Sequence, residues 1–80
     1  MQAKILWADD EMEFLKPHVL FLEAKGYQVE LINNGSEAVE KCQENNYDIV
    51  FLDENMPGIS GLETLARIKE ITPMTPVVMI

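Results

Sequence analysis

Short apolar runs alternate along the chain with longer stretches in which apolar residues recur at helical spacing. The predicted strands cover residues 4–8, 27–32, 49–52 and 76–80. The predicted helices cover residues 11–25, 37–46 and 61–71. Residues 49–52 show no alternation, which is typical of a strand covered on both faces. The resulting order, β-α-β-α-β-α-β with short connections, favours a parallel, right-handed α/β layer.

Turn and capping residues mark where the predicted helices begin and end. Gly26 follows the first helix and suits a left-handed stop. Residues 33–36, Asn-Asn-Gly-Ser, form a turn that can also cap the second helix, and Ser60 with Glu63 forms a capping box before the third. Pro17 interrupts the first helix, so either that helix kinks there or its regular part begins with Pro17 in the first turn.

The composition fits one small domain and limits what it can bind. The 80 residues are 48% hydrophobic and carry 14 acidic against 6 basic residues, a net charge of −8. This balance argues against binding to nucleic acid or to an anionic membrane, which needs clustered bases. The single cysteine, Cys42, excludes an internal disulfide and is expected as a small buried residue. With no signal peptide and no apolar run near the ~18 residues of a membrane span, we expect a cytoplasmic protein.

Acidic residues stand where two of the predicted strands end. Asp9 and Asp10 follow the first strand, and Asp53 follows the third. Strand ends in a parallel sheet share one edge, where ligands bind, so we expect these carboxylates to converge. They would repel one another without a cation, and an all-oxygen site of this kind suits Mg²⁺. We expect Asp10 and Asp53 at the ion, Asp9 secondarily or through a water, and the Asn55 backbone carbonyl completing the protein ligands.

Asp53 is the residue expected to carry the chemistry. An aspartate beside a divalent cation can attack phosphorus and form an acyl phosphate, because the cation offsets charge on the phosphoryl oxygens. The alternative is that Asp9 and Asp10 are solvated loop residues without a function. Asp53 at the end of a second strand argues against this alternative, because carboxylates brought close together destabilise the fold unless a cation compensates them. His18 stands alone on a predicted helix, where a surface position is expected.

These motifs resemble the N-terminal part of a response-regulator receiver domain of two-component signalling. The resemblance rests on the acidic pair within residues 5–11 (Ile-Leu-Trp-Ala-Asp-Asp-Glu), on residues 53–58 (Asp-Glu-Asn-Met-Pro-Gly) and on Gly-Leu-Glu at 61–63. It covers essentially the whole chain. Residues 16–18 and 51–58 are most similar to PorX-type regulators, which couple a receiver to an alkaline-phosphatase-like output module.

The resemblance implies a flavodoxin-like (CheY-like) doubly wound parallel sheet, with residues 1–80 forming the N-terminal part of a single receiver domain. It implies a bacterial phosphorelay protein that takes a phosphoryl group from a histidine kinase or phosphotransfer protein on Asp53. The resemblance also implies that Asp53 loses the phosphoryl group slowly by self-dephosphorylation and that the domain does not turn over a substrate as an enzyme. The family's fifth strand, last two helices, switch Ser or Thr and phosphate-binding Lys would lie beyond Ile80, so we expect this chain alone to phosphorylate poorly.

Two other functions remain open. The first is an aspartate-nucleophile phosphatase, but such enzymes place a second Asp two residues after the nucleophile, where this chain has Asn55. The second is association alone. Residues 77–80 form an apolar strand whose far edge has no partner in the sequence, and such an edge favours a homodimer.

Overall fold

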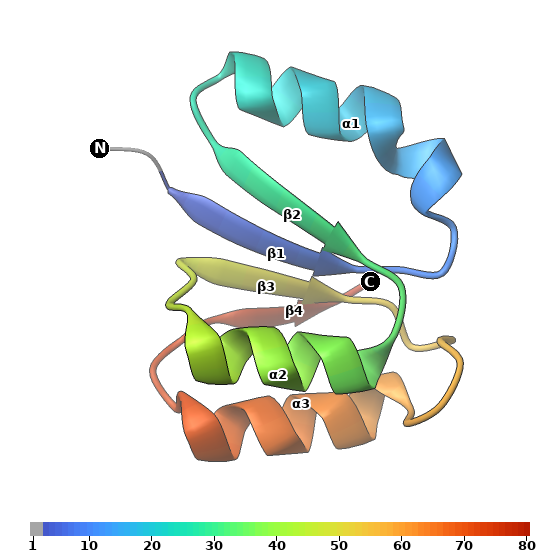
Figure 1. The fold of residues 1–80 in the computed structure, drawn as a ribbon, viewed down its shortest axis with the longest axis vertical. Coiled ribbons are helices and arrows are strands. Elements are labelled where there is room, and N and C mark those ends of the chain that lie inside the picture. The colour runs from blue at the N-terminus through green and yellow to red at the C-terminus, as the bar shows by residue number, and fades with distance from the viewer. Residues whose placement is uncertain (1–2) are drawn as a thin grey trace.

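In the computed structural model, which describes residues 3–80, the strands form one parallel sheet in the order β2-β1-β3-β4 (Figure 1). The strands are β1 (Lys4–Ala8), β2 (Gln28–Ile32), β3 (Ile49–Leu52) and β4 (Val77–Met79). The helices are α1 (Met12–Ala24), α2 (Gly35–Glu44) and α3 (Gly61–Ile71). The predicted order of elements is confirmed, and the strand order is that of a flavodoxin-like sheet. Within residues 3–80, no helix has the length and apolar content that crossing a membrane requires.

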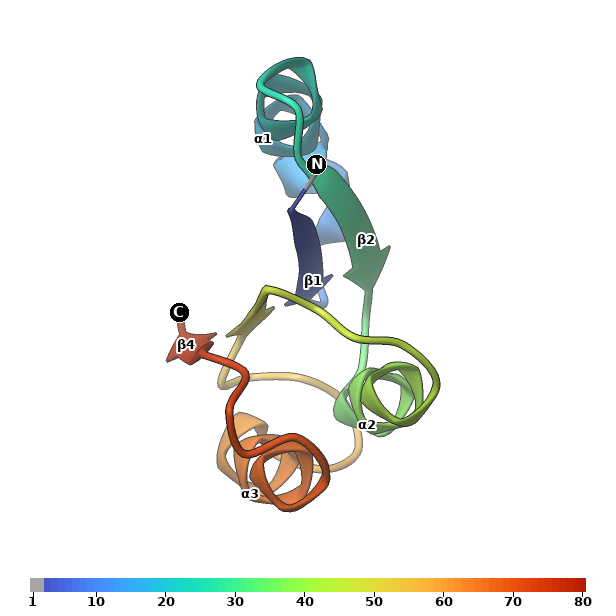
Figure 2. The same ribbon diagram turned by 90° about the vertical axis from the view of Figure 1, so that its left-hand side faces the viewer.

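Helices lie on both sides of the sheet. Figure 2 shows α1 on one side and α2 next to α3 on the other. The main core fills the second side, because alternate residues of a strand point to the same face. Leu6, Val50 and Leu52 are fully buried there, and burial of such a side chain stabilises the fold by roughly 1.5–3 kcal/mol. The full core cluster comprises Leu6, Ala8, Ile32, Ala38, Cys42, Tyr47, Val50, Leu52 and Ile68.

The sheet face beside α1 is more open than the pattern predicts. Ile49 and Phe51 of β3 are only half-buried, so the prediction that residues 49–52 are covered on both faces is wrong for this face. They line an apolar groove beside α1 together with Trp7 and Phe21. Only one side of α1 meets the sheet, so some apolar side chains of this helix stay outside the contact. Phe21, for example, remains 63% exposed.

Helix α1 runs through Pro17 without interruption. It begins at Met12, well ahead of Pro17, so the alternative in which its regular part starts at the proline is wrong. An interior proline removes one helical hydrogen bond, at a cost of ~3 kcal/mol that packing must offset. Gly26, with a φ of 97°, supplies the predicted left-handed stop just past the end of the helix.

Side-chain caps set where α2 and α3 begin. The Asn34 side chain accepts a hydrogen bond from the Glu37 N–H at 2.8 Å, so α2 begins at Gly35 rather than at the predicted residue 37. It also ends earlier than predicted, at Glu44. Before α3, the Ser60 hydroxyl accepts the Glu63 N–H at 3.1 Å, which confirms one half of the predicted capping box. The Glu63 carboxylate accepts a hydrogen bond from Arg67 at 3.2 Å instead of completing the box. The bounds of β1, β3 and α3 are those predicted, and those of α1, β2 and β4 differ from the predicted ones by at most one residue at each end.

Candidate metal centre

The pairing of β1 with β3 brings two acidic residues to the same edge of the sheet. The two strands run parallel with Ala8 opposite Leu52, so Asp9 and Asp53 leave the sheet side by side. The Asp53 N–H donates to the Ala8 carbonyl at 2.9 Å, which continues the ladder past the end of the strands. The Asp9 N–H donates in the same way to Ile32 of β2 at 2.9 Å. The backbone therefore fixes where both side chains begin.

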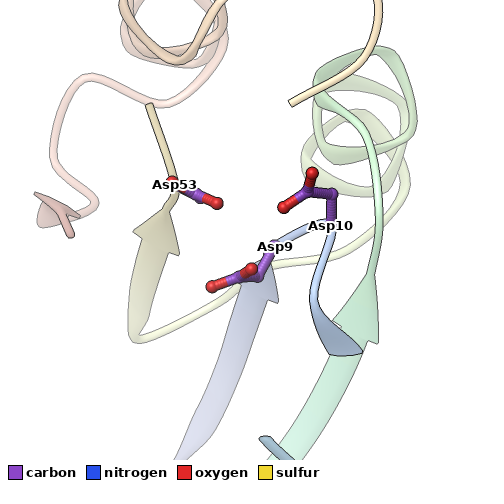
Figure 3. Close-up of side chains that lie close together, drawn as sticks. All are labelled: Asp9, Asp10 and Asp53. Atoms are coloured by element: carbon purple, nitrogen blue, oxygen red, sulfur yellow. The ribbon is translucent and has the colours of Figure 1, made fainter. Parts of the chain in front are cut away.

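The carboxylates of Asp9, Asp10 and Asp53 converge at this edge (Figure 3). One carboxylate oxygen from each residue lies within 4.8 Å of those of the other two. Asp9 and Asp53 are half-buried and Asp10 is exposed. The structure thus brings together the three side chains that the sequence singled out, while their roles as ligands and nucleophile stay predictions.

Short backbone hydrogen bonds orient two of the three side chains. One oxygen of Asp9 accepts the Glu11 N–H at 2.9 Å, and one oxygen of Asp53 accepts the Asn55 N–H at 3.2 Å. Each bond spans two residues, as in an Asx turn, and holds the carboxylate without a partner from elsewhere in the chain. A carboxylate has two oxygens, so each keeps one for a ligand. Asn55 lies in the expected loop, and ligation by its carbonyl stays a prediction.

The charge balance at this edge favours a bound cation. Burial raises the pKa of Asp9 above its ordinary value of 3.8, a hydrogen bond from Glu11 opposes that rise, and the carboxylates of Asp53 and Asp10 add to it. The ion pairs found within residues 3–80 lie on α1, between α2 and β2, and on α3, away from this cluster. Hard carboxylate oxygens, partly open to water, match what Mg²⁺ takes in proteins.

Other candidate residues lie away from the cluster. His18 of α1 lines the apolar groove with Trp7. Trp7 also packs against Phe51, with ring centroids 5.2 Å apart. Trp7 is the single tryptophan of the sequence and precedes Asp9 by two residues, so its fluorescence is a suitable reporter for the acidic edge. Cys42 is buried in the core, as predicted, and its pKa is raised by burial.

One residue at this edge has a packing role that its place in the Gly-Leu-Glu motif at 61–63 does not state. Gly61 is the first residue of α3, and a Cβ there would lie 2.7 Å from the Asp53 carbonyl oxygen. The helix therefore rests directly on the backbone of the acidic loop. A glycine at the first helical position, where proline and good helix formers are favoured, is the available sequence signal.

The chain has similarity to known proteins along nearly its whole length. The family model of the response regulator receiver domain matches residues 5–80. Among curated relatives, the uncharacterized transcriptional regulatory protein YkoG of Bacillus subtilis is 38% identical over 79 residues. That match covers 99% of this chain and 35% of the relative, so the chain spans about a third of its length.

Solved structures agree on the fold. The receiver domain protein (CheY-like) of Methanospirillum hungatei superposes with a TM-score of 0.92 at 25% identity, covering 99% of this chain and 63% of that one. TrrA of Thermotoga maritima, solved in complex with Mg²⁺–BeF, gives 0.88 at 36% identity, covering 98% and 68%. The predicted CheY-like, flavodoxin-type fold is confirmed. With its parallel sheet, its acidic edge and a family match over residues 5–80, the chain belongs to the response regulator receiver domain family.

Proposed function

We propose that this chain is the phosphoacceptor part of a two-component response regulator, with Asp53 as the residue that takes the phosphoryl group. The observation that carries the proposal is the convergence of Asp9, Asp10 and Asp53 within 4.8 Å in a member of the receiver family. Mg²⁺ would be held by these carboxylates and by the Asn55 carbonyl. The Mg²⁺–BeF complex of the similar TrrA supports this choice of metal.

The two carboxylate oxygens of Asp53 suffice for both of its proposed roles. One oxygen accepts the Asn55 N–H and keeps a lone pair for Mg²⁺, and the other attacks the donor phosphorus. With a phosphohistidine donor, a P–O bond forms to Asp53, the P–N bond breaks, and the imidazole nitrogen leaves with the electron pair and takes a proton. A bound Mg²⁺ would neutralise charge on the phosphoryl oxygens as the two anions approach.

The same site argues against turnover as an aspartate-nucleophile phosphatase. Such an enzyme needs a general acid and base beside the nucleophile. Two residues after Asp53 the chain has Asn55, whose amide cannot exchange a proton in this way. The domain therefore acts as the substrate of phosphotransfer, and the acyl phosphate is lost slowly.

The partners follow from this chemistry. The phosphoryl donor would be a histidine kinase or a phosphotransfer protein of the cytoplasm, and the added group changes the local charge by about −2. Curated relatives are longer than this chain, which supports an output domain controlled by the phosphorylation. The PorX-type resemblance of residues 16–18 and 51–58 remains a prediction about which output that is.

Intact-mass measurement tests the proposal. The protein is incubated for an extended time with acetyl phosphate, with Mg²⁺ or with EDTA, beside Asp53→Asn and the control Asp48→Asn. Asp48 directly precedes β3, so this control makes the same change from Asp to Asn at the opposite end of the strands. We expect one phosphoryl group on the wild type and on Asp48→Asn, only with Mg²⁺, and none on Asp53→Asn. An equal gain in Asp53→Asn, or in EDTA, contradicts the proposal.

A second proposal concerns association of two copies through β4. Among residues 3–80 this strand lies at the end of the sheet order; its Val78 is 40% exposed, and Ile80, just past the strand, is 49% exposed. An apolar sheet edge of this kind pairs readily with another chain. We expect light scattering to show a mass that rises with concentration, and Val78→Lys to abolish the rise. A strictly monomeric wild type at high concentration contradicts this second proposal.

A further inference from the structure

Gly61 lies where α3 meets the loop that follows Asp53. It is buried, and a Cβ at this position would lie 2.7 Å from the Asp53 carbonyl oxygen and 2.8 Å from the Glu54 Cα. Both neighbours are backbone atoms, which cannot rotate aside as a side chain can. The third close atom, the Met79 Cε, is the end of a flexible side chain. A side chain at this position would therefore force the backbone of Asp53 and Glu54 to shift.

Hydrogen bonds hold the start of α3 in this position. The Gly61 N–H donates to the Glu54 carbonyl at 3.3 Å, which closes the loop between β3 and α3. The fully buried Thr64 donates its hydroxyl to the Ser60 carbonyl at 2.8 Å, one turn further along. The first turn of the helix and the peptides after Asp53 therefore form one packed unit.

We propose that Gly61 is a positioning residue for the metal site, acting through the peptides of Asp53 and Glu54. The inference rests on the proposed Mg²⁺ function. Through its direct contact with this backbone, the start of α3 sets where the Asp53 carboxylate and the Asn55 carbonyl lie. Gly61 itself supplies no ligand atom to the metal.

The size of the expected displacement supports this role. A Cβ at Gly61 would fall about 0.7 Å short of the 3.4 Å at which ordinary contact begins. Metal–ligand distances are held to roughly 0.2 Å, and Mg²⁺ demands near-ideal octahedral geometry. A backbone shift of several tenths of an ångström at Asp53 and Glu54 would therefore disturb Mg²⁺ binding. Ca²⁺ accepts longer and more variable ligand distances and should be affected less.

Gly35 provides a matched control. It is also a buried glycine at the first position of a helix, and a Cβ there would overlap the Thr64 hydroxyl and approach the Ile59 side chain to 2.8 Å. These atoms belong to side chains and not to the backbone of Asp53 or Glu54. Gly35→Ala therefore strains the packing of α2 on the Ile59 and Thr64 side chains, without direct contact with the backbone of Asp53 or Glu54.

Calorimetric titration of Mg²⁺ and Ca²⁺ into the wild type, Gly61→Ala and Gly35→Ala tests the inference. Loss of a supporting contact behind a metal ligand typically costs ~10–100-fold in affinity. We expect Gly61→Ala to lose about tenfold or more in Mg²⁺ affinity, with a smaller loss for Ca²⁺. Gly35→Ala should stay within about twofold of the wild type for both ions. Equal Mg²⁺ affinity in wild type and Gly61→Ala, or an equal loss in both variants, overturns the inference.

A measurement on the wild type covers the case in which Gly61→Ala does not fold. In ¹⁵N-labelled protein, Mg²⁺ should shift the amide signals of Gly61 and Asn55 together and leave that of Gly35 unchanged. A shifted Asn55 beside an unshifted Gly61 overturns the inference while the proposed function stands. If the wild type binds no Mg²⁺, the proposed function fails first, and the inference falls with it.

Discussion

Replacing Asp10 with asparagine should stabilise the protein when Mg²⁺ is absent and leave it less stable than the wild type when Mg²⁺ is saturating. Without an ion, the Asp10 carboxylate only repels those of Asp9 and Asp53, each within 4.8 Å. Two unit charges at about 4.8 Å repel by ~0.9 kcal/mol in water and ~3.5 kcal/mol at an effective dielectric constant of 20. Because Asp10 is exposed, the lower figure applies, and we expect a gain of about 1 kcal/mol in the free energy of unfolding.

With Mg²⁺ the order of stabilities should reverse. An ion that binds only the folded state stabilises it by about 2.7 kcal/mol when its concentration is 100 times the dissociation constant. Asp10→Asn lacks one of the charged ligands, so its affinity falls and most of this stabilisation is lost. The assay is urea unfolding at low ionic strength, followed by Trp7 fluorescence and by circular dichroism, in EDTA and in Mg²⁺.

Glu40→Gln is the control for the change in net charge. Glu40 is exposed on α2, so its replacement removes one negative charge from the total of −8 without touching the acidic edge. We expect its response to Mg²⁺ to equal that of the wild type. If Asp10→Asn is destabilised in EDTA, or if Mg²⁺ stabilises it as much as the wild type, the three carboxylates do not form the proposed site.

Three further predictions concern the core, the buried thiol and the pH dependence of binding. Leu52→Ala removes a fully buried side chain and should lower the free energy of unfolding by ~2–5 kcal/mol, whereas Val78→Ala at the 40% exposed edge should cost under ~1 kcal/mol by the same urea titration. Burial raises the pKa of Cys42, so less thiolate is present at a given pH. Ellman's reagent at pH 8 should therefore label the native protein far more slowly than the urea-unfolded chain, and equal labelling rates would contradict the burial of Cys42. The pKa of Asp9 is raised above 3.8, so protons compete with Mg²⁺ at a higher pH than at an ordinary aspartate. Mg²⁺ affinity measured by calorimetry should therefore fall as the pH is lowered through that raised pKa, and a flat profile down to the ordinary carboxyl range would contradict the raised value.

The positions of the acidic residues were predictable because strand ends are marked by the sequence itself. The apolar runs of β1 and β3 stop at Asp9 and Asp53, and a parallel sheet brings such ends to one edge. The spacing of apolar residues along the chain therefore predicted the fold, and the strand ends that it marks predicted the acidic cluster. The capping side chains of Asn34 and Ser60 were likewise recognisable, because their hydrogen bonds reach only three residues along the chain.

The features that were not predictable depend on contacts between distant elements. Helix α1 continues through Pro17 despite the local cost of the proline, a choice between alternatives that the sequence pattern leaves open. The half-exposure of Ile49 and Phe51 depends on how much of the sheet α1 covers, which the spacing of apolar residues does not state. The contact of Gly61 with the Asp53 backbone joins α3 to β3 and has no periodic signature.

The most direct test of the central claim is to locate the phosphoryl group after incubation with acetyl phosphate and Mg²⁺. Peptide mapping of the labelled protein distinguishes Asp53 from Asp9, Asp10 and His18. The account predicts that Asp53 is the single modified residue. No label should form when EDTA replaces Mg²⁺ during the incubation, and none should form on Asp10→Asn. Label on another residue, or on Asp53 to the same extent without Mg²⁺, would contradict a metal-dependent phosphoacceptor at the edge where β1 and β3 end.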